Sequence, residues 1–482
     1  MALETTMNSV EDKLIDGLSY QLEPGAKYIT NKRSVKFYPQ GSNIYKSRGG
    51  TKMIKIMLNG DEFLDPNSVR VSFDLKNEDA LLRLINVGGP WTFFRRLTIK
   101  CGGTTIEDID YYGRTHEMFH KLLPKDVRKN EVDEGFGFEL NLSQWQRDNN
   151  WTAENKPAGG SVRLNNYRTV SFKPLAGLFN QPKMIPLQFC PLSIELELTD
   201  NAVDALVETV PKSDPGHTYD ANSLSEESAV GALSQVWRIE NPVVLCDLVS
   251  IDNQLMNEYS NVVLSGRNLP ISYSTLITQL QSLSSGNNGS QSGLINVTRA
   301  VSRLQSAFVT FSRSTDANGN RIIYEGRKVT DVNTSENKLY SNDLTEFYGP
   351  HTYNGGQGHF DPSTELEFQL QIGSKKFPES EIKSTSEAFY NLRKTMGVHA
   401  SSNHSMGIDM HEYLFDNFIV GIDTEKSMQA SGTGENLKSG QLISLKYKFT
   451  DSTAAHWPKQ MYITLHSQQL LEIGATGVQV YD

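Results

Sequence analysis

The sequence predicts an all-β chain of sandwich or barrel type, and three observations support this. Short runs rich in β-branched and aromatic residues recur along the chain, and several alternate apolar and polar positions. Turn signals rich in glycine, proline and asparagine separate these runs. Helical patterns are few and short, and they lie between strand-like runs, which is typical of sandwiches rather than layered α/β folds.

Each expected element can be placed by its residue range. Period-two alternation and β-branched enrichment indicate the strands, and turn residues bound them. The strand-like runs lie at 34–38, 53–58, 69–75, 96–100, 167–173, 192–199, 236–239, 243–246, 307–312, 321–324, 365–372, 416–421, 441–449 and 461–466. The helical patterns lie at 111–123, 252–263, 296–306 and 385–396.

Composition fits a folded chain of two or three domains. The 482 residues are 38% hydrophobic and 21% charged, which suffices for a sizeable core. The formal net charge of −10 offers no overall basic face for coating DNA, although a local basic patch stays open. Cys101, Cys190 and Cys246 are far apart and lack metal-ligand spacing. We therefore expect a reducing compartment rather than a disulfide framework.

The chain divides into an arm and two β units. Residues 1–30 are expected to form an N-terminal arm, either mobile or ordered against a partner. Residues 31–232 form the first unit and end in an acidic linker or loop over 201–232. Residues 233–482 form the second unit, with long surface loops. We expect no signal peptide and no membrane span, because no long apolar stretch is present.

Positions 116–120 read H-E-M-F-H, which is an H-E-x-x-H pattern. On a helix this spacing places two imidazoles on one face with a glutamate beside them, as in zinc metalloproteases. The later histidine of one large group of these enzymes is missing, although Glu139 stays open as a further ligand. The polar residues before the motif predict a partly exposed structural helix. We therefore expect no catalytic, cofactor-binding or metal site here.

A segment of the second half repeats this region. Residues 115–122 and 385–392 both read T-x-E-x-F-x-x-L, each after a strand and a turn, which indicates two copies of one fold unit. The repeat predicts that the threonines begin a helix and that the glutamates lie in its first turn, near the positive end of the helix dipole. The phenylalanine and leucine would dock the helix on a sheet. The repeat positions are Thr115, Glu117, Phe119, Leu122, Thr385, Glu387, Phe389 and Leu392.

Several segments resemble a known family. Residues 37–43 and 58–75 resemble the opening of the first jelly roll in double-jelly-roll major capsid proteins of polinton-like viruses, adintoviruses and, more distantly, virophages. Residues 372–378, followed by 387–394, are similar to a segment of the second roll in that family. The stretch 421–443 resembles the approach to the late strands of that roll.

The resemblance implies a fold and a function. The fold is all-β, with two tandem eight-stranded antiparallel jelly rolls and a few short helices in loops. The function is that of a major capsid protein, not an enzyme, without cofactors, located in the virion. Homotrimers would form pseudo-hexameric capsomers of an icosahedral DNA virus shell. Expected partners are neighbouring capsomers, penton and minor capsid proteins, and a host receptor reached through loops. No sequence-specific nucleic acid binding is expected.

Two other functions stay open. The runner-up is a glycan-binding spike or fibre module, and the remote alternative is the H-E-x-x-H zinc hydrolase. The lack of a fibrous shaft repeat favours the capsid over the spike.

Overall fold

The structure is a computed structural model of the whole chain. It describes residues 29–79, 84–86, 88–124, 127–128, 161–162, 166–206, 208–209, 234, 236–284, 290–299, 301, 303–312, 339–340, 347, 349, 366–397, 406–408, 413, 417–426, 434–436, 442–450, 458–475 and 477–481. Most of the expected arm, most of the acidic stretch 201–232, the expected strand at 321–324, and Glu139 lie outside these residues. Among the helices described, none is long and apolar enough to cross a membrane.

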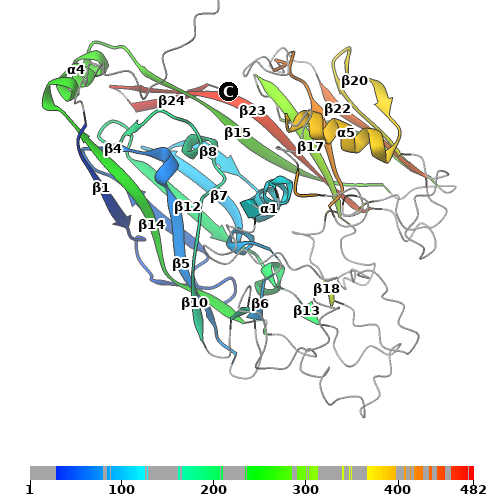
Figure 1. Cartoon of the computed structure of the whole chain (residues 1–482), viewed down its shortest axis with the longest axis horizontal. Helices are drawn as coiled ribbons and strands as arrows, with labels where there is room; N and C mark the ends of the chain where they lie inside the picture. Colours follow the sequence, from blue (N-terminus) through cyan, green and yellow to red (C-terminus); the bar gives the residue numbers. More distant parts are fainter. Residues whose placement is uncertain are drawn as a thin grey trace, which may run out of the picture.

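The first jelly roll consists of two facing antiparallel sheets (Figure 1). One sheet has the order β10-β5-β14-β1, with the short strands β2 (Ile44–Tyr45), β4 (Phe63–Leu64) and β11 (Ile185–Pro186) attached. The other has the order β3-β12-β7-β8. The main strands are β1 (Ile29–Phe37), β3 (Met53–Leu58), β5 (Arg70–Asn77), β7 (Phe94–Cys101), β8 (Thr104–Ile109), β10 (Tyr167–Phe172), β12 (Leu192–Leu198) and β14 (Trp237–Ile251).

The second jelly roll repeats this strand order. Its sheets run β21-β17-β23-β15, with β24 (Gly477–Tyr481) added beside β23, and β16-β22-β19-β20. The main strands are β15 (Leu269–Ser282), β16 (Ser290–Val297), β17 (Leu304–Ser312), β19 (Leu366–Ile372), β20 (Lys375–Ile382), β21 (Ile419–Asp423), β22 (Ile443–Thr450) and β23 (Gln460–Gly474). Two more short pairs are β6 (Leu84–Ile85) with β9 (Ser161–Val162) and β13 (Glu208–Thr209) with β18 (Leu339–Tyr340). The predicted all-β double jelly roll is confirmed.

The helices occupy the same place in both rolls. Helix α1 (Tyr112–Leu122) connects toward β10 after β8, and α5 (Thr385–Thr395) connects toward β21 after β20. Helix α4 (Asn253–Leu264) joins the two rolls. The helix expected at 296–306 is wrong, since this segment ends β16 and begins β17. Pairing with β22 and β23 there outweighs the local helical pattern.

Strand β14 belongs to the first roll, although the second unit was expected to begin at 233. It pairs with β1 and β5 over most of its length. The runs expected at 236–239 and 243–246 are one strand, interrupted by a register shift where Asn241 has a φ of 49°. The change of roll therefore falls after Ile251, at helix α4.

A ribbon of two long strands covers both rolls. Strands β15 and β23 pair along their whole lengths and cross from one roll to the other (Figure 1). The ribbon residues that join the first hydrophobic core are Ile271, Tyr273, Leu276, Leu471 and Ile473. Those that join the second core are Met461, Ile463 and Leu465. The two rolls therefore share apolar packing and are not two independent domains joined only by a linker.

Candidate functional site at the junction of the two rolls

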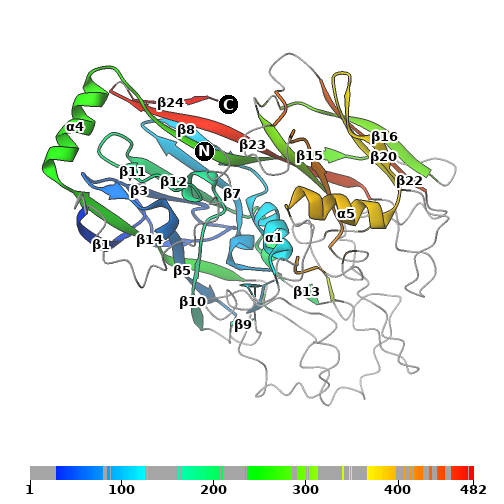
Figure 2. The same cartoon turned by 45° about the horizontal axis from the view of Figure 1, so that its top comes forward.

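Helix α1 lies between the two rolls, as the two views agree (Figures 1 and 2). It was expected to be partly exposed, but it is largely buried, because one face packs on the first roll and the opposite face on the second. Its buried residues are Tyr112, Gly113, Arg114, Thr115, Glu117, Met118, His120 and Leu122. An isolated helix of this polarity would be marginal, so tertiary packing on both faces accounts for its stability.

The H-E-x-x-H residues on the first face surround Trp91. His116 stacks on the indole with ring centroids 4.0 Å apart, and His120 lies tilted at 4.6 Å. Glu117 Oε2 accepts hydrogen bonds from Trp91 Nε1 at 2.8 Å and from the Gly89 backbone N–H at 3.2 Å. The motif therefore anchors the 3₁₀ turn η3 (Pro90–Phe93) to the helix.

The electrostatics of this cluster favour packing over chemistry. Burial, and then the neighbouring His120, hold the pKa of His116 well below its usual value, so its ring stays neutral. His116 Nδ1 lies 3.2 Å from the Tyr112 hydroxyl. Within the described part of the chain, no group of three or more histidine, cysteine, aspartate or glutamate side chains could hold a metal ion.

Arg114 anchors the second face of α1. Its guanidinium donates to Thr310 Oγ1 at 3.1 Å and to the Phe311 carbonyl at 3.2 Å, both on β17. It also lies over the rings of Phe347 and Tyr462, with centroid distances of 4.7 and 4.1 Å. Cation–π contacts of this kind strengthen when water is excluded, and Arg114 is only 2% exposed.

Hydroxyl and apolar contacts complete the second face. Thr115 Oγ1 lies 2.8 Å from Thr278 Oγ1 on β15, which lies 3.0 Å from Thr464 Oγ1 on β23. Phe119 meets Phe308 of β17 edge to face at 5.1 Å. Leu122 joins the second core cluster. The second roll therefore buries a helix that the first roll supplies.

Two repeat positions of α1 lie differently from expectation. The helix begins at Tyr112, so Thr115 lies one turn inside it rather than at its start. Glu117 lies in the second turn and binds η3 instead of the helix N-terminus. Phe119 packs on Phe308, whose sheet belongs to the second roll. The helix starts earlier because Tyr111 enters the left-handed region with a φ of 52°.

The second copy is placed differently. Helix α5 begins at Thr385, with Ser384 as its N-cap, and the Ser384 Oγ accepts from the Glu387 N–H at 3.1 Å. Glu387 Oε2 accepts from the Lys383 N–H at 3.0 Å. Thr385 and Leu392 are buried within the second roll. Phe389, the remaining repeat position, packs on Tyr413 at 4.9 Å in that same roll. The repeat residues of α5 therefore face their own roll.

Glu107 and Gly177 are junction residues that sequence reasoning missed. The Glu107 carboxyl accepts from the Gly177 and Leu178 N–H groups and from Thr275 Oγ1 on β15, at 2.9 to 3.0 Å. Burial raises the pKa of Glu107 to about 7. A Cβ on Gly177 would lie 1.5 Å from the Ser274 carbonyl oxygen, so only glycine permits this approach. Neither residue lies in a recognisable sequence motif. Their partners Thr275 and Ser274 are far away in sequence, so no local pattern signals these contacts.

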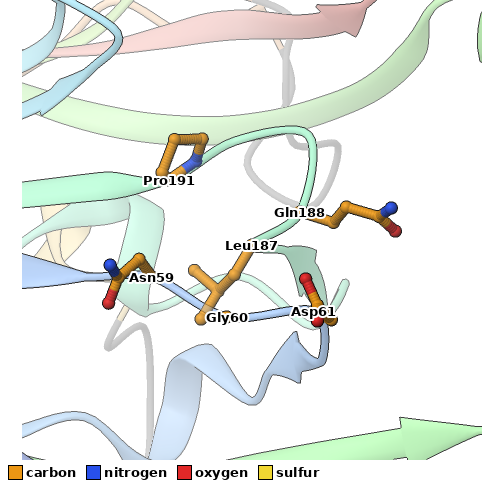
Figure 3. Close-up of a pocket in the computed structure, with 6 residues that line it drawn as sticks. All are labelled: Asn59, Gly60, Asp61, Leu187, Gln188 and Pro191. Carbon is orange, nitrogen blue, oxygen red and sulfur yellow. The ribbon is translucent and has the colours of Figure 1, made fainter.

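A hollow of about 500 Å³ lies in the first roll (Figure 3). Its lining comes from the turn after β3 and the loop before β12. The lining residues are Asn59, Gly60, Asp61, Leu187, Gln188 and Pro191. One carboxylate and two amides do not form a nucleophile and base pair, so this lining supports no reaction.

Comparisons with known proteins agree on the fold. No family model matches the sequence, and no curated protein matches it. A chain in the cryo-EM structure of the Sputnik virophage matches with a TM-score of 0.59 at 10% identity, covering 98% of this chain and 92% of that chain. A chain of the PBCV-1 virus capsid matches with a TM-score of 0.54 at 12% identity, covering 96% of this chain and 99% of that chain. The double jelly roll is thus shared over nearly the whole length.

Proposed function

We propose that this chain is the major capsid protein of an icosahedral DNA virus and acts in the virion as a structural subunit, not as an enzyme. The observation that carries the proposal is the end-to-end match of both rolls to a chain of the PBCV-1 virus capsid. A likeness confined to one roll would fit any β-sandwich protein, whereas two rolls joined in this order are a more specific arrangement.

The junction supports this proposal. A shell subunit has to keep its two rolls in one orientation, and the rolls here share α1, the ribbon β15–β23 and the Glu107 contacts. The H-E-x-x-H residues that suggested a hydrolase are engaged in packing on Trp91. This use of the motif favours a structural role over zinc catalysis.

The finer assembly is also part of the proposal. Three copies would form a pseudo-hexameric capsomer, since each chain contributes two similar rolls to a ring. Capsomers would contact each other, penton proteins and minor capsid proteins. Loops connecting the strands at one end of each roll would be available to a host receptor.

Sedimentation and electron microscopy of the purified full-length protein test the proposal. We expect trimers with a six-lobed outline, or closed shells, at micromolar concentration. A monomer that persists at high concentration would contradict the proposal. Saturable binding on a glycan array by such a monomer would favour the spike or fibre alternative instead.

A further inference from the structure

Two of the three cysteines meet at one end of the first roll. Cys101 ends β7 and is paired in register with Leu192, the first residue of β12. Cys190 lies two residues before Leu192, in the turn between β11 and β12. Both side chains are buried in the first hydrophobic core, and both are free thiols. The fold therefore brings together two thiols that are far apart in the sequence.

A hydrogen bond between the two thiols makes them chemically unequal. The hydrogen bond from Cys190 holds the pKa of Cys101 below its usual value, because it stabilises the Cys101 thiolate. The same hydrogen bond, and then burial, raise the pKa of Cys190. The thiolate is the nucleophilic form of cysteine. Cys101 is therefore the nucleophile of the pair, and Cys190 is the thiol that keeps its proton.

The third cysteine, Cys246, is an internal comparison for this pair. It lies on β14 in the facing sheet, where its neighbour in register is Val35 of β1. Cys246 is 3% exposed and Cys101 is 4% exposed, so burial does not distinguish them. Burial, and then the charge of Asp247, raise the pKa of Cys246 to about 12. Buried thiols with raised pKa values are inert, so the contact with a second thiol is what sets Cys101 apart.

The turn that carries Cys190 borders the hollow of the first roll (Figure 3). The lining of this hollow includes Leu187, Gln188 and Pro191, which flank Cys190 in the sequence. Cys190 itself is 0% exposed, and Cys101 only slightly more, so a reagent that reaches either sulfur has to be small. Hydrogen peroxide is a small, uncharged oxidant that meets this requirement.

We propose that Cys101 and Cys190 form an oxidation site, at which hydrogen peroxide converts the two thiols into a disulfide while Cys246 stays reduced. The Cys101 thiolate attacks one peroxide oxygen, the O–O bond breaks, and a sulfenic acid forms on Cys101. The departing hydroxide takes up the proton that Cys101 released and becomes water. The Cys190 sulfur then attacks the Cys101 sulfur, and the sulfenic hydroxyl leaves as a second water with the Cys190 proton. Two electrons thus pass from the two sulfurs to the peroxide.

The disulfide would close a loop of about 90 residues that contains α1. A cross-link over such a length restricts the unfolded chain and should stabilise the first roll. The thiols are expected inside a reducing cell, and the disulfide outside it. The oxidation site itself is independent of the proposed capsid function. Its use, which is to stabilise a particle after it leaves the cell, rests on that function.

Peptide mass spectrometry of the folded full-length protein tests the site without any variant. The protein is exposed to hydrogen peroxide, unfolded in guanidinium with N-ethylmaleimide, and digested without reduction. We expect one disulfide, which joins Cys101 to Cys190 and is reversed by dithiothreitol, and N-ethylmaleimide on Cys246. In Cys190→Ser the second step is blocked, so dimedone, which traps sulfenic acids, should label Cys101 at least about tenfold faster than Cys246.

Thermal unfolding of matched variants gives the second measurement. The wild-type protein and the control Cys246→Ser should each unfold about 3 °C or more higher after oxidation than before it. Cys101→Ser and Cys190→Ser should show no such rise. Wild-type protein that keeps all three thiols while folded, or that oxidises Cys246 as fast as Cys101, overturns the oxidation site.

Sedimentation of the same wild-type samples separates this result from the proposed function. A trimer that forms no disulfide overturns the oxidation site and leaves the capsid function standing. A persistent monomer that forms the disulfide supports the oxidation site and contradicts the capsid function.

Discussion

Helices α1 and α5 occupy the same place in two copies of one fold but have opposite surroundings. Each follows the last strand of the sheet β3-β12-β7-β8 or of its counterpart β16-β22-β19-β20. Helix α1 is covered on both faces and joins the rolls, whereas α5 packs on its own roll and leaves Tyr390 exposed. Topology therefore decides where the helix lies, and the neighbouring roll decides which of its faces is buried.

The same residue types consequently do different work in the two copies. Glu117 is buried and binds the η3 turn, while Glu387 binds backbone at the start of its own helix. Thr115 bonds to a threonine of the other roll, while Thr385 begins a helix. Equivalent sequence positions in a duplicated fold thus need not make equivalent contacts.

Gly177→Ala should reduce the difference in burial between α1 and α5 more than any other change. The added methyl group would push the two rolls apart, so that α1 would be exposed on one side as α5 is. A Cβ there overlaps the Ser274 carbonyl oxygen, and backbone cannot move aside as a flexible side chain would. We expect the free energy of unfolding to fall by about 3 kcal/mol or more. Chemical denaturation measures this, and hydrogen exchange should show α1 losing protection before α5.

Gly60→Ala is the matched control for this change. Nothing lies within 4 Å of a Cβ built on Gly60, so the same added methyl group meets open space. Its free energy of unfolding should stay within about 0.5 kcal/mol of wild type. Equal losses in both variants would show that the close approach at Ser274 is not what holds the rolls together.

A change of pH should act on the junction of the two rolls through Glu107. Glu107 has a pKa of about 7 in the folded chain and 4.5 as its ordinary value. Between these values the unfolded chain releases a proton that the folded chain keeps. The contribution of Glu107 to the free energy of unfolding should therefore be largest below pH 4.5 and fall by about 3 kcal/mol as pH rises to 7.

Subtracting the pH profile of Glu107→Gln isolates this group. The variant keeps the shape of the side chain but cannot titrate, so the wild-type minus variant difference should carry the slope between pH 4.5 and 7. His116, whose pKa is lowered, contributes a slope of the opposite sign below its ordinary value of 6.5, and it cancels in the difference. A flat difference profile would contradict the raised pKa of Glu107.

The two repeat glutamates, Glu117 and Glu387, should differ in how much each contributes to the free energy of unfolding, and this difference should be smaller than the effects above. Glu117→Ala leaves the Trp91 Nε1–H and the Gly89 N–H buried without their acceptor and should cost about 2 kcal/mol. Glu387→Ala removes a contact to backbone at an exposed helix start and should cost about 1 kcal/mol. Paired urea denaturation curves measure both. Equal losses in the free energy of unfolding would mean that the burial of α1 does not increase the contribution of Glu117 to stability.

Much of the fold could be read from local patterns. Alternation places β3, β12 and β22 within a residue or two, since apolar and polar residues largely alternate along each of these strands. The helix predicted at 296–306 is wrong. The apolar spacing there fits a helix, but pairing with β22 and β23 makes the ends of this segment parts of two strands. Local patterns do not place strand β14 in the first roll, because its partners β1 and β5 lie about 160 to 220 residues away in sequence.

The sequence by itself determined the all-β class, the duplication and the places of α1, α4 and α5, because these depend on periodicity and turn residues that are local. Only the tertiary structure decided that α1 joins the two rolls and that its histidines pack on Trp91. Only it showed that Glu107 and Gly177 hold the junction. These contacts join residues from distant strands, and burial, which sets their energies and the Glu107 pKa, exists only once both rolls have come together.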